Sequence, residues 1–147
     1  MLYTDYLKYF ESTLVSQVEE STKYNSQPLI FDERQSGVVF RMNVEKEGNY
    51  CLSVDQNDMS RQEGEDFRDG WSRCTILLIK DNSSKLVVEY EYVGGILKYN
   101  EQHPTLRASI GPGRYIIYIK LDPTLNHRAF PKQANLVVYS SHAAYLK

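Results

Sequence analysis

The sequence has few cysteines, one tryptophan and no long apolar run. Its 147 residues include two cysteines, Cys51 and Cys74. Its apolar stretches fall far short of the roughly 20 residues that a membrane-spanning helix needs, and the first residues lack the basic and apolar regions of a secretory signal. Because both cysteines fall in predicted strands of a chain expected to be intracellular, we predict free buried thiols. We therefore expect a cytoplasmic protein, with a cytoskeletal or ciliary assembly as one setting.

Excess charge of one sign is also missing. The net charge is −2 and the isoelectric point is about 5.9, and the scattered basic residues form no stripe for nucleic acid. Residues 1–97 carry 10 Lys and Arg against 17 Asp and Glu, a net of −7, while residues 98–147 carry 7 against 2, a net of +5. We interpret this asymmetry as attraction between the acidic and the basic part of the chain within the fold. Docking on a charged partner is the alternative.

Tyrosine is abundant, with twelve residues against five phenylalanines. It suits half-buried strands and contact surfaces, because its ring is apolar and its hydroxyl is polar. The length predicts a single domain over residues 1–147.

Period-two alternation predicts an all-β, antiparallel β-sandwich. A short N-terminal helix is expected within residues 1–13, where Tyr3, Tyr6, Leu7 and Phe10 share one helical face. The expected strands, about eight, cover residues 14–18, 38–44, 50–54, 71–80, 85–92, 106–110, 114–121 and 134–140.

Three of these strands carry more specific predictions. Residues 38–44 and 50–54 flank a turn and predict a hairpin. Residues 75–79 are apolar on both faces, which is typical of a strand covered on both sides. In residues 85–92 we expect the alternate residues from Leu86 to Tyr92 to face inward, and Gly94-Gly95 to end the strand.

Neither catalysis nor a zinc site is indicated. A cysteine nucleophile would need a neighbouring base, and nothing around Cys51 or Cys74 matches such a signature with His103, His127 or His142. The histidines and cysteines also lack the close spacing of zinc ligands.

Five segments resemble the β-sandwich that follows the protease core in calpains, known as domain III. They are Tyr3–Phe10, Cys51–Gln56, Trp71–Ile79, Gly111–Ile119 with its Pro-Gly-x-Tyr pattern, and Leu136–Ser140. The usual Pro-Ser-Thr after the Pro-Gly-x-Tyr strand is absent, and Arg61 stands alone where the family has a basic cluster. The resemblance implies a non-catalytic domain, because the catalytic residues of calpains lie in the protease core.

The acidic loop after Gln56 raises the question of calcium. Its carboxylates are the oxygen ligands that calcium prefers, but the loop lacks EF-hand spacing and the loop after Tyr92 has no acidic residue before Glu101. We therefore expect a solvated loop and no cofactor. If the loop does bind calcium, the candidate ligands are Asp58, Glu63, Glu65, Asp66 and Asp69.

A membrane surface is a less favoured partner than a protein. The basic residues Arg114, Lys120 and Lys132 do not sit on a single parity of one strand, which weakens attraction to anionic lipid. Tyr50, Tyr90, Tyr92 and Tyr115 alternate with aliphatic residues and are expected to be half-buried. The predicted interaction residues are Tyr99, Tyr118, Tyr139, Tyr145, Arg114, Lys120, Arg128 and Lys132.

These observations predict a calpain-like β-sandwich that serves as a protein-interaction or structural subunit of a larger assembly. The alternative is a calcium- or phospholipid-responsive regulatory domain of a calpain-like cysteine protease.

Overall fold

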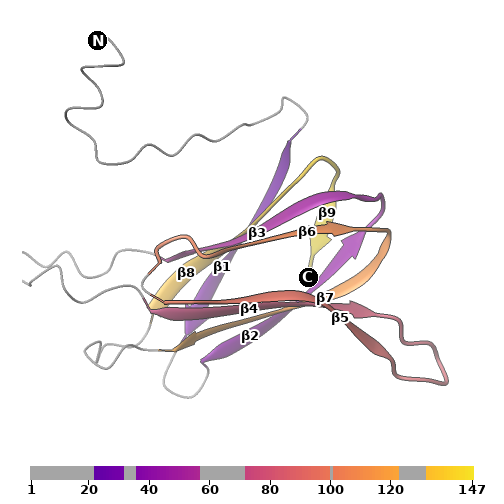
Figure 1. The fold of residues 1–147 in the computed structure, drawn as a ribbon, viewed down its shortest axis with the longest axis horizontal. Helices are drawn as coiled ribbons and strands as arrows, with labels where there is room; N and C mark the ends of the chain where they lie inside the picture. Colours follow the sequence, from indigo (N-terminus) through magenta and orange to yellow (C-terminus); the bar gives the residue numbers. More distant parts are fainter. Residues whose placement is uncertain (1–21, 32–35, 57–71, 100, 123–131) are drawn as a thin grey trace, which may run out of the picture.

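The computed structural model describes residues 22–31, 36–56, 72–99, 101–122 and 132–147. These residues form nine β-strands and no helix (Figure 1). The strands are β1 Lys23–Phe31, β2 Gly37–Val44, β3 Gly48–Gln56, β4 Arg73–Asp81, β5 Tyr90–Lys98, β6 Thr105–Ile110, β7 Gly113–Asp122, β8 Lys132–Ser140 and β9 Ala144–Leu146. The predicted all-β class is confirmed. The helix expected within residues 1–13 and the strand expected at 14–18 lie outside the described residues.

The strands form two antiparallel sheets that share one core. The four-stranded sheet has the order β1-β8-β3-β6, and the five-stranded sheet has the order β5-β4-β7-β2-β9. Figure 1 shows the sheets as two layers. One hydrophobic cluster takes side chains from both sheets, for example Leu52 and Val54 from β3, and Ile76 and Ile117 from β4 and β7. Burial of this apolar area is the main stabilising contribution to such a fold.

Strand β7 shows why the alternation in the sequence predicted the strands well. Tyr115, Ile117, Ile119 and Leu121 are all buried, and the residues between them are half-buried or exposed. Gly113 begins the strand with a φ of +153°, a value that residues with a side chain rarely adopt. The turn predicted at residues 111–113 therefore has a backbone reason for its glycine.

The predicted hairpin of residues 38–44 and 50–54 is wrong. Strand β2 pairs with β7 and β9, whereas β3 pairs with β6 and β8 in the other sheet. Alternation shows that each strand has a buried face, but it does not show which strand lies beside it. The connection between β2 and β3 crosses from one sheet to the other, so both buried faces meet across the core.

The strand predicted at residues 85–92 starts later than expected. Strand β5 begins at Tyr90, includes Gly94 and Gly95, and shifts its register against β4. Leu86 is 95% exposed. Before β5, the Ser83 hydroxyl accepts a hydrogen bond from the backbone N–H of Glu89 at 3.0 Å. Serine hydroxyls thus hold this segment as a turn, a known competitor of strand pairing.

Two further strands were not predicted. Strand β1 looked like a polar stretch because only Leu29 and Phe31 are buried and Pro28 interrupts it. A proline is tolerated there because β1 lies at the edge of its sheet. Strand β9 has only three residues, too few to show a period in the sequence.

Candidate functional site

The outer face of the five-stranded sheet carries a group of apolar side chains. Residues 75–79 were expected to be covered on both sides. Within β4, however, only the inner-face residues Cys74, Ile76 and Leu78 are buried. The outward-facing Leu77 and Ile79 stay partly exposed. The expectation of double coverage is therefore wrong for the described residues, and an apolar surface is left open.

Strand register joins these side chains to neighbours of the same kind. Leu77 lies opposite Tyr118 of β7, and Tyr118 lies opposite Val39 of β2. Ile79 lies in the same way between Tyr92 and Ile116. We define the apolar face as the outward side chains that form these cross-strand rows, together with their neighbour Leu97: Val39, Leu77, Ile79, Tyr92, Leu97, Ile116 and Tyr118.

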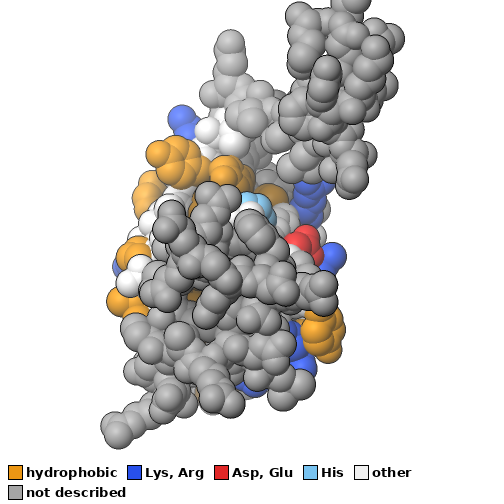
Figure 2. Space-filling model, turned by 90° about the vertical axis from the view of Figure 1, so that its left-hand side faces the viewer, with side chains coloured by type: hydrophobic (Ala, Val, Ile, Leu, Met, Phe, Trp, Pro, Cys, Tyr) orange, Lys and Arg blue, Asp and Glu red, His pale blue; other side chains and the backbone are white. Residues whose placement is uncertain are grey.

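Several of these side chains are well exposed. The exposed fractions are 61% for Val39, 68% for Tyr92 and 45% for Leu97. Tyr92 was expected to face inward, so that prediction is wrong. The register shift between Leu78 and Ile79 turns this part of β5 outward relative to the predicted alternation. Figure 2 shows hydrophobic side chains reaching the surface on both flanks of one end of the molecule, with lysine and arginine side chains beside them.

Two glycines on the outer side of this sheet lie beneath side chains of the apolar face. A Cβ atom on Gly37 would come within 2.8 Å of the Tyr118 hydroxyl oxygen, and one on Gly95 would come within 2.6 Å of the Leu77 side chain and 3.2 Å of the Tyr92 hydroxyl. Both glycines are therefore covered by outer-face side chains, an arrangement that compensates for the missing side chain of a strand glycine.

Ion pairs close both ends of the apolar face. At one end the Asp122 carboxylate lies 2.7 Å from Lys120 Nζ and 3.5 Å from Arg73 Nε. At the other end Arg114 Nη2 lies 3.7 Å from Asp81. A hydrogen bond from the Ser83 side chain, then one from its backbone, lowers the pKa of Asp81, and Arg114 adds to this effect. An apolar centre with a charged rim is the usual anatomy of a protein interface.

A hydrogen-bonded turn presents further apolar side chains beside this face. The Ser84 N–H donates to the Val87 carbonyl at 2.8 Å, and the Ser84 hydroxyl accepts from the N–H groups of Leu86 and Val87. Leu86, Val87 and Val88 are nevertheless exposed, Val88 by 75%. In Figure 1 this β4–β5 turn projects beyond the body of the sheets. The turn thus holds three apolar side chains in solvent in an ordered conformation.

The outer face of the four-stranded sheet is different in character. Its polar side chains bond to one another: the Ser53 hydroxyl donates to Asp55 at 2.9 Å, and Asp55 lies 3.1 Å from His103 Nδ1. Thr105 donates to Ser53 at 3.4 Å. These polar groups already have partners, and the exposed apolar side chains of this sheet are Tyr24, Ile30 and Tyr139 among the described residues.

The structure brings some of the predicted interaction residues together. Arg114, Tyr118 and Lys120 share the outer face of β7, so two of the three basic residues do lie on one parity. Tyr145 lies opposite the outward Asn43 at the edge of the same sheet and is 52% exposed. These residues surround or belong to the apolar face.

The remaining predicted residues are dispersed. Tyr99 follows β5 and lies under the Arg73 guanidinium, 5.3 Å from carbon to ring centroid. Tyr139 lies on the other sheet, opposite Tyr24. Lys132 begins β8, also in that sheet. Some predicted residues lie outside the described ranges: Arg128 and the calcium candidates Asp58, Glu63, Glu65, Asp66 and Asp69.

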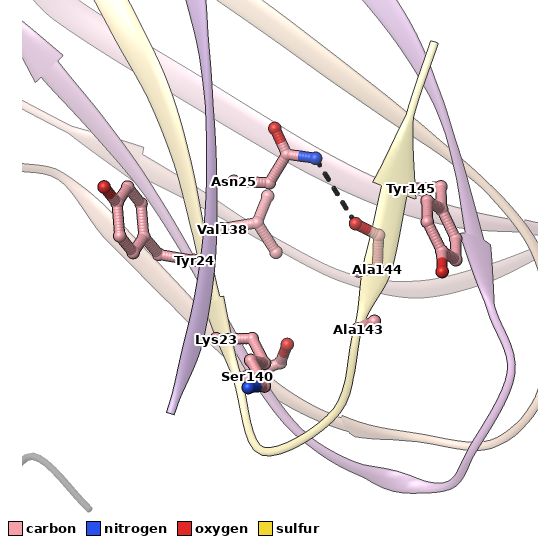
Figure 3. A pocket seen from close by; sticks show the side chains of 8 residues that line it. All are labelled: Lys23, Tyr24, Asn25, Val138, Ser140, Ala143, Ala144 and Tyr145. Atoms are coloured by element: carbon pink, nitrogen blue, oxygen red, sulfur yellow. Dashed lines mark hydrogen bonds between the residues drawn. The ribbon is translucent and has the colours of Figure 1, made fainter. Parts of the chain in front are cut away.

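A small pocket lies where the two sheets meet at β1 and β9 (Figure 3). It encloses about 220 Å³ and is lined by Asn25, Val138, Ala144 and neighbouring residues. The Asn25 side-chain amide donates to the Ala144 carbonyl at 3.4 Å across it. In Figure 3 Tyr24 and Tyr145 point away from the pocket on opposite sides. The pocket therefore joins two strand edges and gathers no reactive group.

The prediction of free buried thiols is confirmed for Cys74, whereas Cys51 is free but only half-buried. Both cysteines are unpaired, and burial raises the pKa of Cys74 to about 12, with the charge of Glu101 as a smaller cause. A thiol with such a pKa carries almost no thiolate at neutral pH. Within the described ranges no three His, Cys, Asp or Glu residues gather to hold a metal ion, and no helix there is long and apolar enough to cross a membrane.

Sequence reasoning missed most of the apolar face. The signal was present, because β4, β7 and β2 carry apolar residues on both parities, as at Ile76 and Leu77 or Val38 and Val39. In residues 75–79 that pattern was interpreted as coverage on both sides. An apolar sheet face that is exposed gives the same sequence pattern.

Comparisons with known proteins find similar folds at low sequence identity. No family model matches the chain, and no curated protein matches it. Among solved structures it is similar to the pre-peptidase C-terminal domain of a Bacillus anthracis collagenase, with a TM-score of 0.46 and 16% identity over 78% of this chain and 87% of that one. It is also similar to a protein of Sulfurospirillum deleyianum, with a TM-score of 0.48 and 14% identity over 78% and 96%.

Proposed function

We propose that the chain is a non-catalytic β-sandwich of the calpain domain III type that serves as a protein-interaction or structural subunit of a larger assembly. The resemblance of five sequence segments to calpain domain III supports this family assignment. The apolar face supports the interaction role and is the observation that carries it. Isolated exposed apolar side chains are ordinary on protein surfaces, but a contiguous apolar patch is typical of a binding site.

Docking on the apolar face would use ordinary interface physics. Partner side chains would cover Leu77, Ile79 and Tyr118, and each Å² of apolar area removed from water would contribute about 25 cal/mol before the costs of association are subtracted. The paired charges of Asp122 and Asp81 at the two ends would orient the partner without being stripped of their own partners.

The alternative is a calcium- or phospholipid-responsive regulatory domain. The exposed turn at Leu86–Val88 favours membrane contact, because an apolar tip can enter a lipid surface. The charges beside it are balanced, however, since Lys80 and Lys85 lie near Asp81 and Glu89 in the sequence. Calorimetric titration with calcium and flotation with anionic liposomes test this alternative, and no response in both assays removes it.

The interaction role is tested by capture from a native extract with matched variants. The double variant Tyr92→Lys with Leu97→Lys places charge on the apolar face, and Tyr24→Lys with Tyr139→Lys places the same charge on the other sheet. We expect mass spectrometry to recover a defined set of proteins with the wild type and the control, and to lose it with the apolar-face variant. Equal recovery by all three proteins, or a chain found only as a free monomer, would contradict the proposal.

A further inference from the structure

Strand β2 is paired along only half of its outer edge. On one side it pairs with β7 over its whole length. On the other side β9 covers Met42–Val44, and the backbones of Arg41 and Lys147 exchange two hydrogen bonds of 2.9 Å as the last rung. Among the described residues no strand lies on that side of Gly37–Phe40. We call these four residues the open edge.

The open edge has backbone groups available for pairing. Arg41 directs both its N–H and its C=O toward β9, since it exchanges both bonds with Lys147. Backbone groups alternate in direction along a strand, so Val39 and Gly37 direct theirs to the same side. Ser36, of the opposite parity, accepts a hydrogen bond from Leu121 of β7 at 3.0 Å, as this alternation requires.

The open edge lacks the usual protection of exposed strand edges. Proteins block such edges with charges, prolines, bulges or very short strands. The other edge strands show these devices: β1 contains Pro28, β5 has a register shift, and β6 has six residues and carries Arg107. The open edge reads Gly-Val-Val-Phe, with no charge and no proline.

We infer that the open edge binds an extended segment of a partner protein by strand addition. This inference rests on the proposed interaction function and names how the partner is held. Backbone hydrogen bonds to Gly37 and Val39 would supply affinity, and side chains of alternate direction would supply specificity.

Strand β9 indicates the chemistry of the segment, because it already binds the same edge. Its Leu146 lies beside Met42 and packs against the core, while Tyr145 faces outward. The partner segment is therefore extended, and it is uncharged because the open edge itself offers no charge to pair with. It places apolar side chains inward beside Val38 and Phe40, which lie at the margin of the core, and a second apolar side chain outward beside Val39.

Hydrogen exchange on the free chain tests the first step. We expect the Val39 amide to exchange at least 100-fold faster than the amides of Val38 and Arg41, at every protein concentration. Protection of Val39 in dilute protein would overturn the inference, because the edge would then be covered by the chain itself. Protection that grows with protein concentration would also overturn it, since the occupant would be a second copy of the chain.

Peptide selection tests the second step. A phage-displayed library of random ten-residue peptides is selected on the immobilised chain, and enriched sequences are synthesised and titrated against labelled protein. We expect alternating apolar peptides without proline that protect the Val39 amide. Val39→Pro removes the outward N–H and fixes φ at about −65°, and it should weaken binding at least tenfold, whereas Val39→Thr should change it less than twofold.

Three results of the selection would overturn the inference: no enrichment, equal binding by Val39→Pro, or protection elsewhere on the chain. The variant with Tyr92→Lys and Leu97→Lys separates the two proposals, because these residues lie on β5, far across the sheet from the open edge. If extract proteins depend on Tyr92 and Leu97 but not on Val39, the interaction function stands and strand addition fails.

Discussion

Tyr50 and Tyr115 make the same hydrogen bond from opposite sheets. The Tyr50 hydroxyl donates to the Lys46 carbonyl at 3.0 Å, and the Tyr115 hydroxyl donates to the Gly111 carbonyl at 2.8 Å, in each case four residues upstream. Both rings are buried. Burial is the main cause that raises the pKa of each phenol, with smaller effects of Glu45 on Tyr50 and of Glu91 on Tyr115. Each pair resembles the tyrosine corner of β-sandwiches.

We predict that Tyr50→Phe and Tyr115→Phe each lower the free energy of unfolding by about 1 kcal/mol, the usual net value of one hydrogen bond. The phenyl ring keeps the buried apolar contacts, so the loss is confined to the hydroxyl. Urea denaturation at pH 7 measures it, with the exposed Tyr92→Phe as a control that should leave the midpoint unchanged. An unchanged midpoint in both buried variants would show that the two bonds are not stabilising.

Gln56 links the two sheets at the opposite end of β3. Its side-chain amide donates to the Ser72 carbonyl at 2.9 Å and to the Glu101 carbonyl at 3.1 Å, and its oxygen accepts from the Ser72 N–H at 3.0 Å. Gln56 and Ser72 are both buried. One amide side chain therefore satisfies buried backbone groups of Ser72 just before β4 and a partly buried carbonyl of Glu101 before β6.

We predict that Gln56→Ala lowers the free energy of unfolding by about 3 kcal/mol, because buried backbone groups lose their partners. The control is Gln133→Ala, at an exposed position of β8, and it should stay within about 0.5 kcal/mol of the wild type. Urea denaturation of both variants gives the comparison. Equal stability of Gln56→Ala and the control would mean that water replaces the amide without loss.

The sequence predicted strands correctly where every second side chain points into the core. In β7 one parity is apolar at every position from Tyr115 to Leu121, and burial of Ile117 follows directly. The pairing of strands could not be predicted in the same way, because β2 and β3 face the same core from different sheets. Local hydrogen bonds of Ser83 and Ser84 also overrode the strand propensity of residues 85–89.

The candidate site was predicted only in part, because exposure depends on neighbouring layers. Tyr118 was predicted as an interaction residue, and it lies on the outer face of β7. Leu77 and Ile79 were not, because an apolar outer face has the same sequence pattern as a strand covered twice. The open edge was not predictable at all, since it depends on how far β9 extends along β2.

The two cysteines should differ in reactivity. Cys74 is fully buried, and its raised pKa of about 12 leaves little thiolate, whereas Cys51 is half-buried. We expect a chromogenic disulfide reagent at pH 8 to titrate at most one thiol of the native protein, and both thiols in urea. The variant Cys51→Ser should abolish the native reaction. A native reaction that persists in Cys51→Ser would show that β4 opens to solvent.

Asp81 should make the β4–β5 turn sensitive to acid. Its folded-state pKa is lowered from 3.8, first by the hydrogen bonds from Ser83 and then by Arg114. A lowered folded-state pKa means that the ionised carboxylate stabilises the turn above pH of about 4, and that this contribution is lost as the pH falls through the folded-state pKa. We expect the Asp81 carboxyl carbon to titrate below 3.8 by NMR, and the Ser83 amide to exchange faster as Asp81 becomes protonated. In Asp81→Asn, which can still accept from the Ser83 N–H, the exchange rate should lose this pH dependence after correction for intrinsic exchange. A midpoint at or above 3.8 would show that the bonds to Ser83 do not favour the charged form.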